Sequence, residues 1–143
     1  MVRIVGILLS VVFAVLGLLH LYWAAGGSGG GQSAIPMFNG ERLFTPSPGS
    51  TLAVAALLFL AMLIVLGRIG VWGANLPAWP FYVGTFGISL AFLVRAVGDF
   101  RYVGFFKTVS DTDFARLDNY LFSPLCLLIA IAALIIGVSR KTN

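Results

Sequence analysis

Four long apolar stretches dominate the pattern of hydrophobic and polar positions along the chain. They cover residues 4–25, 48–67, 80–97 and 121–138, and charged residues are nearly absent from all four. A helix needs about 20 apolar residues to cross the roughly 30 Å hydrocarbon core of a bilayer. Unpaired backbone groups are costly in lipid, and none of the stretches alternates as a barrel strand would. The pattern predicts an all-α fold, an integral membrane four-helix bundle that forms one transmembrane domain over residues 1–143.

Two signals of local structure lie between the first and second predicted spans. Asn39–Gly40 has apolar flanks and is typical of the tight turn of a short β-hairpin, because both turn positions require positive φ. Ser47–Pro48 is typical of a helix start, since the serine can cap and a proline in the first turn loses no hydrogen bond. We therefore expect a short outer hairpin followed by a helix from Pro48.

The residues ahead of the fourth span predict a short amphipathic helix in the membrane interface. The run from Ser110 to Asp113 resembles a helix cap. The apolar residues that follow it fall on one helical face: Phe114, Leu117 and Leu121. Ser123–Pro124 then either begins the fourth span afresh or kinks it away from the short helix.

The composition agrees with a membrane protein and excludes several other classes. Charged residues make up 10% of the 143 residues, hydrophobic residues make up 59%, and the mean hydropathy is +1.01. A soluble domain has about 25% charged residues, so a soluble globule, a disordered chain and a nucleic-acid binder with a basic stripe are excluded. One cysteine excludes a disulfide framework and a CxxC redox centre within one chain.

The charges between the spans give a weak indication of orientation. Four spans place both termini on one side, and the first span is too long for a signal peptide, the alternative suggested by Arg3. The terminal side carries basic residues without acids: Arg3, Arg68, Arg140 and Lys141. The other side carries as many basic residues, mixed with acids: Arg42, Arg101, Lys107 and Arg116. The Lys/Arg count is tied, and we expect cytoplasmic termini because their charges have no acid beside them.

Small residues line one face of three spans, and each of these faces leads to a polar or ionisable side chain. The faces contain Gly6, Ser10, Gly17 and His20 in the first span, Gly84, Gly87, Ala91 and Arg95 in the third, and Ser123, Cys126, Ala130, Ala133 and Gly137 in the fourth. Transmembrane helices pack through small residues. We therefore expect His20, Arg95 and Cys126 to face the bundle interior.

Arg95 requires a carboxylate, because a central arginine in hydrocarbon costs roughly 2.5–3.5 kcal/mol on insertion scales. Asp99, one helical turn further along, and Asp118, from the fourth span, can each supply one. One interpretation is a structural charge network, including Arg101, that fixes the outer loop to the helix ends. The other is a ligand-binding or catalytic site.

The candidate ligand-binding residues gather near the outer ends of the spans: His20, Trp23, Arg95, Asp99, Arg101, Tyr102, Asp118 and Tyr120. The catalytic candidates are His20, Asp99 and Asp118. His20 is either a buried, hydrogen-bonded imidazole or a proton-transfer group. No metal site is predicted, and a haem held by two histidines would need a second chain, since this chain has one.

Three blocks of sequence resemble a known family. They are His20–Ala24 with the glycine cluster and Ile35–Pro36, then Val97–Lys107, then Arg116–Tyr120 with Ser123–Cys126. Together they resemble the small four-span bacterial membrane proteins grouped as "domain of unknown function 3995". The resemblance covers nearly the whole chain and implies a multi-pass protein of the bacterial plasma membrane. It implies no activity and no catalytic residue.

Three functions stay open at this point. The first is an outward-facing polar pocket for a lipophilic small molecule, with apolar walls that include Phe100 and Phe105. The second is an accessory or assembly subunit of a larger membrane complex. The third is an enzyme that uses His20 as acid and base, so whether the protein is an enzyme stays undecided. No cofactor is identified. The expected partners are the lipid bilayer, a lipophilic ligand, and a second copy or a larger membrane complex, without nucleic acid.

Overall fold

The computed structural model describes residues 1–139 and contains four helices that are long and apolar enough to cross a membrane. Three are α1 (Val2–Ala24), α2 (Pro48–Arg68) and α3 (Trp79–Val97). The fourth ends with α5 (Ser123–Val138). The predicted all-α four-span architecture is confirmed. Arg140 and Lys141, used above for orientation, lie outside the described residues.

The connection between α1 and α2 contains a 3₁₀ turn and the predicted hairpin. The turn, η1, covers Gln32–Ala34, and strands β1 (Met37–Phe38) and β2 (Glu41–Arg42) pair antiparallel. The turn residues Asn39 and Gly40 have φ values of 52° and 81°. These are the positive angles that an Asn-Gly turn supplies.

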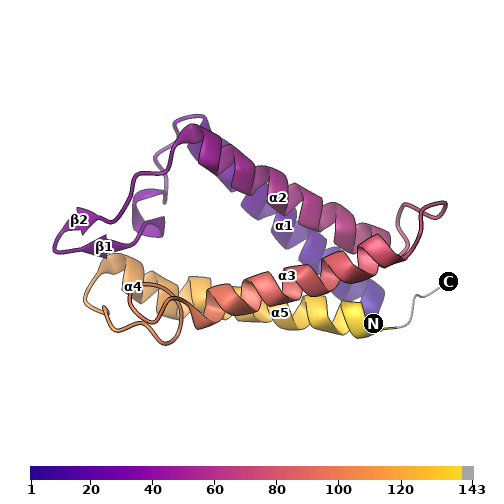
Figure 1. Ribbon diagram of the computed structural model, residues 1–143. Helices are drawn as coiled ribbons and strands as arrows, with labels where there is room; N and C mark the ends of the chain where they lie inside the picture. Colours follow the sequence, from indigo (N-terminus) through magenta and orange to yellow (C-terminus); the bar gives the residue numbers. More distant parts are fainter. Residues whose placement is uncertain (140–143) are drawn as a thin grey trace.

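The four long helices form two pairs that meet at one end and diverge at the other. Figure 1 shows α1 beside α2 and α3 beside α5, with the pairs converging near the N-terminus. We call that end, which also holds the α2–α3 connection, the terminal end. We call the opposite end, where β1, β2 and α4 (Asp113–Leu117) lie, the loop end. The first connection reaches across the loop end, because η1 contacts α4.

The hydrophobic core common to all four helices lies away from the loop end. Its buried residues are Leu9 and Phe13 of α1, Leu58, Ala61 and Val65 of α2, Ile88 of α3, and Ile129, Ala133 and Ile136 of α5, with Ile69 just after α2. Helix α2 runs from the loop end to the terminal end, so its core positions fall in its middle and last turns. Close packing of these side chains holds the pairs together where they converge.

The predicted small-residue faces are confirmed in α1 and α5 but only in part in α3, where Gly84 packs against Ile64 of α2. Gly87 and Ala91 are exposed, and an added Cβ at Gly87 would meet nothing within 4 Å. Instead α3 buries Thr85, Ile88 and Ser89, and the Ser89 hydroxyl donates to the carbonyl oxygen of Ala130, at 2.8 Å. Lipid is as apolar as a helix interior, so interhelical hydrogen bonds and shape decide which face is buried.

The fourth span is one continuous 26-residue helix, from Asp113 to Val138. It begins with α4, capped by the Thr112 hydroxyl, which accepts a hydrogen bond from the N–H of Ala115 at 3.1 Å. It continues through the π-helical turn η2 (Asp118–Phe122) into α5. The predicted cap is confirmed.

Ser123–Pro124 neither restarts the span nor separates it from the short helix. Proline has no N–H, and the π turn replaces the ordinary bonding pattern: the N–H of Ser123 donates to the carbonyl oxygen of Asp118. The apolar face predicted for Phe114, Leu117 and Leu121 is not evenly buried, because Phe114 is 3% exposed while Leu121 is 51% exposed. The turn breaks the regular helical spacing between these residues.

Candidate functional site

Asp118 is the centre of a polar network at the loop end. Its side chain is completely buried, and its Oδ1 accepts a hydrogen bond from Nη2 of Arg95 at 2.8 Å. Its Oδ2 accepts three more, from Nζ of Lys107 at 2.9 Å, the N–H of Gly104 at 2.8 Å and the hydroxyl of Ser123 at 3.0 Å. The network therefore ties α3, the α3–α4 connection and the fourth span to one carboxylate.

Lys107 is the member of this network that the sequence interpretation did not select. Its side chain is 2% exposed, and its ammonium also donates to the carbonyl oxygen of Gly104 and to the side-chain oxygen of Asn119. An ammonium has three hydrogens, so Lys107 is fully paired. Its position within the second resembling block is the one signal in the sequence that could have pointed to it.

Arg95 is only partly satisfied by the network. Its side chain is 34% exposed, and its Nη1 is buried without a hydrogen-bond partner among residues 1–139. Two cations, Arg95 and Lys107, share the single negative charge of Asp118. The cluster therefore keeps an excess positive charge and an unused donor, and both favour an anionic or strongly polar neighbour.

The network lies close to the boundary of the hydrocarbon core. At 1.5 Å per residue, Asp118 is about 30 Å along the fourth helix from Val138, which is roughly the thickness of that core. Arg95 lies in the last turn of α3. The charges are therefore near the headgroup level, where burying them costs less than at the bilayer centre.

Asp99 does not pair with Arg95 and instead organises the connection after α3. Its Oδ1 accepts hydrogen bonds from the N–H groups of Arg101 at 2.9 Å, Tyr102 at 2.7 Å and Val103 at 2.9 Å. Burial acts to raise the pKa of Asp99, but these three backbone donors outweigh it and hold the pKa below its usual value.

Two glycines close the same connection into a compact turn. Gly98 and Gly104 have φ values of 87° and 89°. A Cβ on Gly98 would lie 1.7 Å from the carbonyl oxygen of Val103, and one on Gly104 would lie 2.3 Å from that of Val97. The N–H of Gly104 is one of the donors to Asp118, so this backbone crossing positions the network.

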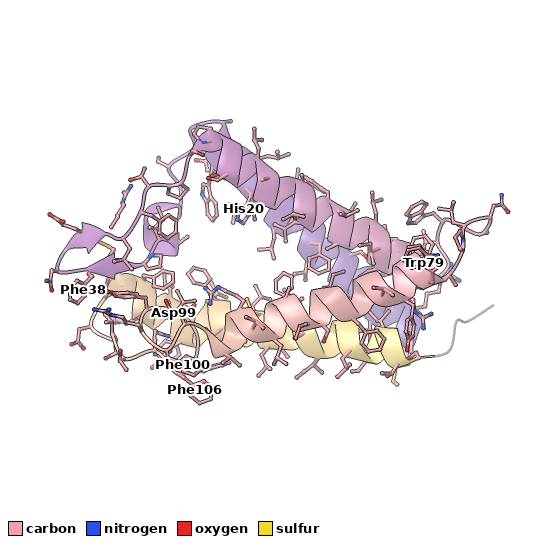
Figure 2. The ribbon with its side chains drawn as sticks, in the orientation of Figure 1. His20, Phe38, Trp79, Asp99, Phe100 and Phe106 are labelled. Carbon is pink, nitrogen blue, oxygen red and sulfur yellow. The ribbon has the colours of Figure 1, made fainter. Side chains whose placement is uncertain are left out.

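His20 lies on the other helix pair, without an acidic partner. Its Nδ1 is 2.8 Å from the carbonyl oxygen of Leu16, which can only accept, so Nδ1 carries the hydrogen. Its ring meets Trp23 edge-on, with centroids 5.0 Å apart, and the indole N–H donates to the carbonyl oxygen of Gly29. No carboxylate within residues 1–139 forms a hydrogen bond or ion pair with His20. Figure 2 shows His20 at the loop end of α1, across from Asp99 on the other pair.

The remaining candidates lie toward the surface of the loop end. The guanidinium of Arg101 lies 5.1 Å from the centroid of the Tyr102 ring, and that ring meets Phe38 of β1 edge-on at 6.0 Å. Tyr120 is 86% exposed. The structure thus joins Arg95 to Asp118, and it joins Asp99, Arg101 and Tyr102 within the α3–α4 connection. It leaves His20 with Trp23 on α1.

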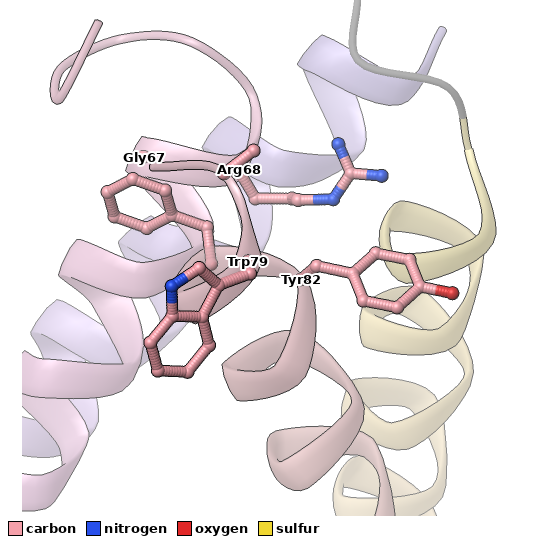
Figure 3. A pocket seen from close by; sticks show the side chains of 6 residues that line it. Gly67, Arg68, Trp79 and Tyr82 are labelled. Carbon is pink, nitrogen blue, oxygen red and sulfur yellow. The ribbon is translucent and has the colours of Figure 1, made fainter. Parts of the chain in front are cut away.

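The described residues, 1–139, line a cavity at each end of the molecule, and neither of these cavities is lined by His20 or Arg95. The terminal-end cavity has a volume of about 320 Å³ and is lined by Gly67, Arg68, Ala78, Trp79, Phe81 and Tyr82 (Figure 3). The Arg68 guanidinium lies 5.8 Å from the Tyr82 ring and donates to the carbonyl oxygens of Gly137 and Ser139, which end α5. The loop-end cavity has a volume of about 440 Å³ and is lined by Ser33, Asp113, Arg116, Leu117 and Tyr120.

Comparison with known proteins gives a family but no activity. The model of the family described as "Protein of unknown function (DUF3995)" matches residues 13–133. Neither a curated protein nor a solved structure matches the chain. The matched region includes α2, α3, the Asp118 network and the loop-end half of α1. The chain therefore belongs to this family of proteins of unknown function, as a membrane protein with four transmembrane helices.

Proposed function

We propose that this protein binds a lipophilic molecule with an acidic headgroup between its two helix pairs, at the loop end. The single observation that carries the proposal is the buried Nη1 of Arg95, which has no partner within residues 1–139. A buried guanidinium nitrogen without an acceptor costs free energy unless a ligand or water supplies one. A carboxylate or phosphate is the acceptor that a guanidinium binds best.

The change of burial along the bundle supports this location. Phe13, Val65 and Ala133, in the shared core, are completely buried. Nearer the loop end, His20, Arg95 and Cys126 are only partly buried. In a membrane the space beside these side chains is filled by hydrocarbon or by a bound molecule. Lipid chains alone leave Nη1 of Arg95 without an acceptor, which favours an amphiphile with an acidic group.

The side chains on α1 would contact the same molecule from the other pair. Because Nδ1 of His20 is a donor to Leu16, a neutral His20 presents Nε2 as an acceptor. Trp23 offers an apolar ring beside it. The pairing of Arg95 with Asp118 would fix the guanidinium in place, so that little conformational entropy is lost on binding. An acid–base enzyme has less support, because His20 lacks an orienting carboxylate within residues 1–139.

The test is to identify what copurifies with the protein. The wild type and the Trp23→Ala and His20→Ala variants are extracted in mild detergent, and lipophilic molecules are measured by mass spectrometry. We expect one acidic amphiphile at a near-stoichiometric level in the wild type and several-fold less in both variants. Leu18→Ala, on an exposed position of α1, is the matched control and should retain it. An extract that holds only bulk lipid, in the same proportions for all variants, contradicts the proposal.

The setting that we propose follows from the charges and the family. The loop end faces outward from a bacterial plasma membrane, and both termini are cytoplasmic. Residues 1–143 act as one transmembrane domain. The ligand would then enter from the outer leaflet, and a second copy or a larger membrane complex is a further partner that native mass spectrometry in mild detergent would detect.

A further inference from the structure

The connection between α3 and α4 is held in one conformation by several independent constraints. Asp99 accepts three backbone hydrogen bonds, and Gly98 and Gly104 approach so closely that a Cβ on either one would overlap the backbone of the other. The N–H of Phe105 donates to the carbonyl oxygen of Ala96, at 2.8 Å. Further along the connection, Lys107 is buried against Asp118. Side chains carried by this segment therefore have fixed positions relative to the helices.

Two phenylalanines on this fixed segment are exposed. Phe100 and Phe106 are each 62% exposed, and their ring centroids lie 6.2 Å apart. Phe100 also has a φ of 63°, in the left-handed region that favours glycine or asparagine. The chain therefore carries a large aromatic residue where the backbone disfavours it and where much of the ring has no protein neighbour. A contact outside the chain would account for both features.

The position of the two rings identifies the contact. The last turns of α3 expose Leu90 and Val94, at 63% and 60%, so hydrocarbon surrounds α3 at least as far as Val94. Helix α3 ends at Val97, and Phe100 follows three residues later. Figure 2 shows Phe100 and Phe106 pointing away from the bundle, on the side of the α3–α5 pair opposite His20. The rings therefore extend sideways at the level where the hydrocarbon core ends.

We propose that Phe100 and Phe106 form an anchor that inserts into the lipid bilayer at its interface, beside the loop end of α3. Aromatic rings are enriched at this level of membrane proteins. The constrained backbone holds the rings in the lipid without further loss of conformational entropy. In return the anchored connection keeps Lys107 and Gly104 in position around Asp118. The bilayer is favoured over a protein partner because the rings continue the lipid-exposed surface of α3.

Spin labelling of the protein in vesicles tests this anchor. In a Cys126→Ala background, Phe100→Cys and Phe106→Cys are labelled separately with a nitroxide and reconstituted in phosphatidylcholine–phosphatidylglycerol vesicles. Collision with oxygen, which concentrates in lipid, is compared with collision with a water-soluble nickel chelate. Leu90→Cys is the control inside the hydrocarbon, and Asp111→Cys, in the same connection, is the control in water.

We expect the oxygen-to-nickel ratio at both positions to exceed that of Asp111→Cys several-fold and to stay below that of Leu90→Cys. A ratio equal to that of Asp111→Cys places the rings in water and overturns the proposal. Immobilised spectra with little access to either reagent place them in a protein interface and overturn it as well. Position 106 has no left-handed backbone, so its variant remains informative if the variant at position 100 does not fold.

Discussion

Replacing Asp118 with asparagine should destabilise the protein more than any other substitution of an acidic residue. Asparagine keeps the shape of the side chain but removes the charge that Arg95 and Lys107 share. The Oδ2 atom of Asp118 accepts three hydrogen bonds, and asparagine places either its amide oxygen or its amide nitrogen at that position, depending on how the amide is turned. The Asp118→Asn variant thus contains two cations at the loop end with no carboxylate paired to either.

The expected loss follows from the burial of the network. Removing one partner of a buried ion pair costs about 3–5 kcal/mol, because an uncompensated charge stays behind. Asp118 is completely buried and Lys107 is 2% exposed, so water cannot screen that pair. Arg95 is 34% exposed, and screening reduces its share of the loss. We therefore expect a loss of about 3–5 kcal/mol in the free energy of unfolding, mainly through Lys107.

Equilibrium unfolding in mixed detergent and sodium dodecyl sulfate micelles, followed by circular dichroism, measures this loss. Asp111→Asn makes the same chemical change at an exposed position and should stay within about 0.5 kcal/mol of the wild type. Lys107→Met should destabilise the wild type but stabilise the Asp118→Asn variant, because it then removes an unpaired buried cation. Additive effects of the two substitutions, or a loss of less than about 1 kcal/mol for Asp118→Asn, would refute the reasoning.

Three further substitutions or conditions give separate outcomes. Gly98→Ala should cost more than the about 1–3 kcal/mol of its glycine-only backbone (φ 87°, ψ −166°) alone, since its Cβ would overlap the carbonyl oxygen of Val103. Gly87→Ala, in the middle of α3 with open space around its Cβ, should instead stabilise the protein by about 0.5–1 kcal/mol in the same unfolding assay. The pKa of Asp99 is lowered in the folded state, so the stability that its carboxylate contributes is complete above the unfolded pKa near 3.8 and is lost as the pH falls through the folded pKa. Hydrogen exchange of the backbone N–H groups of residues 101–103 should accelerate in that pH range, and Asp99→Asn should abolish this dependence of exchange on pH. Ser47→Ala should destabilise α2 by about 1 kcal/mol by removing the cap on the N–H of Ser50, measured by thermal unfolding.

Those parts of the fold that depend on local sequence could be predicted. Length and apolar content give the spans, because lipid requires helices of that length. The turn at Asn39–Gly40 and the caps at Ser47 and Thr112 each depend on a few neighbouring residues. Each feature is determined within one turn of the chain, so no knowledge of the packing is needed.

The features that depend on packing could not be predicted in the same way. Asp99 and Asp118 were equally good partners for Arg95 by type and approximate depth, and the choice follows from the turn in which Asp99 binds three backbone N–H groups. The predicted burial of Gly87 and Ala91 in α3 was wrong because apolarity does not separate lipid neighbours from protein neighbours. The common face of Phe114 and Leu121 assumed 3.6 residues per turn, and the wider π turn after Leu117 changes the angle between them.

The π turn links the helix defect to the network. Pro124 cannot donate a hydrogen bond to the preceding turn, so a regular helix would leave a carbonyl oxygen unpaired in the span. The wide turn instead brings the N–H of Ser123 to the carbonyl of Asp118, and the Ser123 hydroxyl donates to the Asp118 carboxylate. The same residue pair is thus joined by a backbone bond of the wide turn and by a side-chain bond of the network. Both effects depend on Ser123 following Asp118 by five residues, the spacing that a π turn brings into contact.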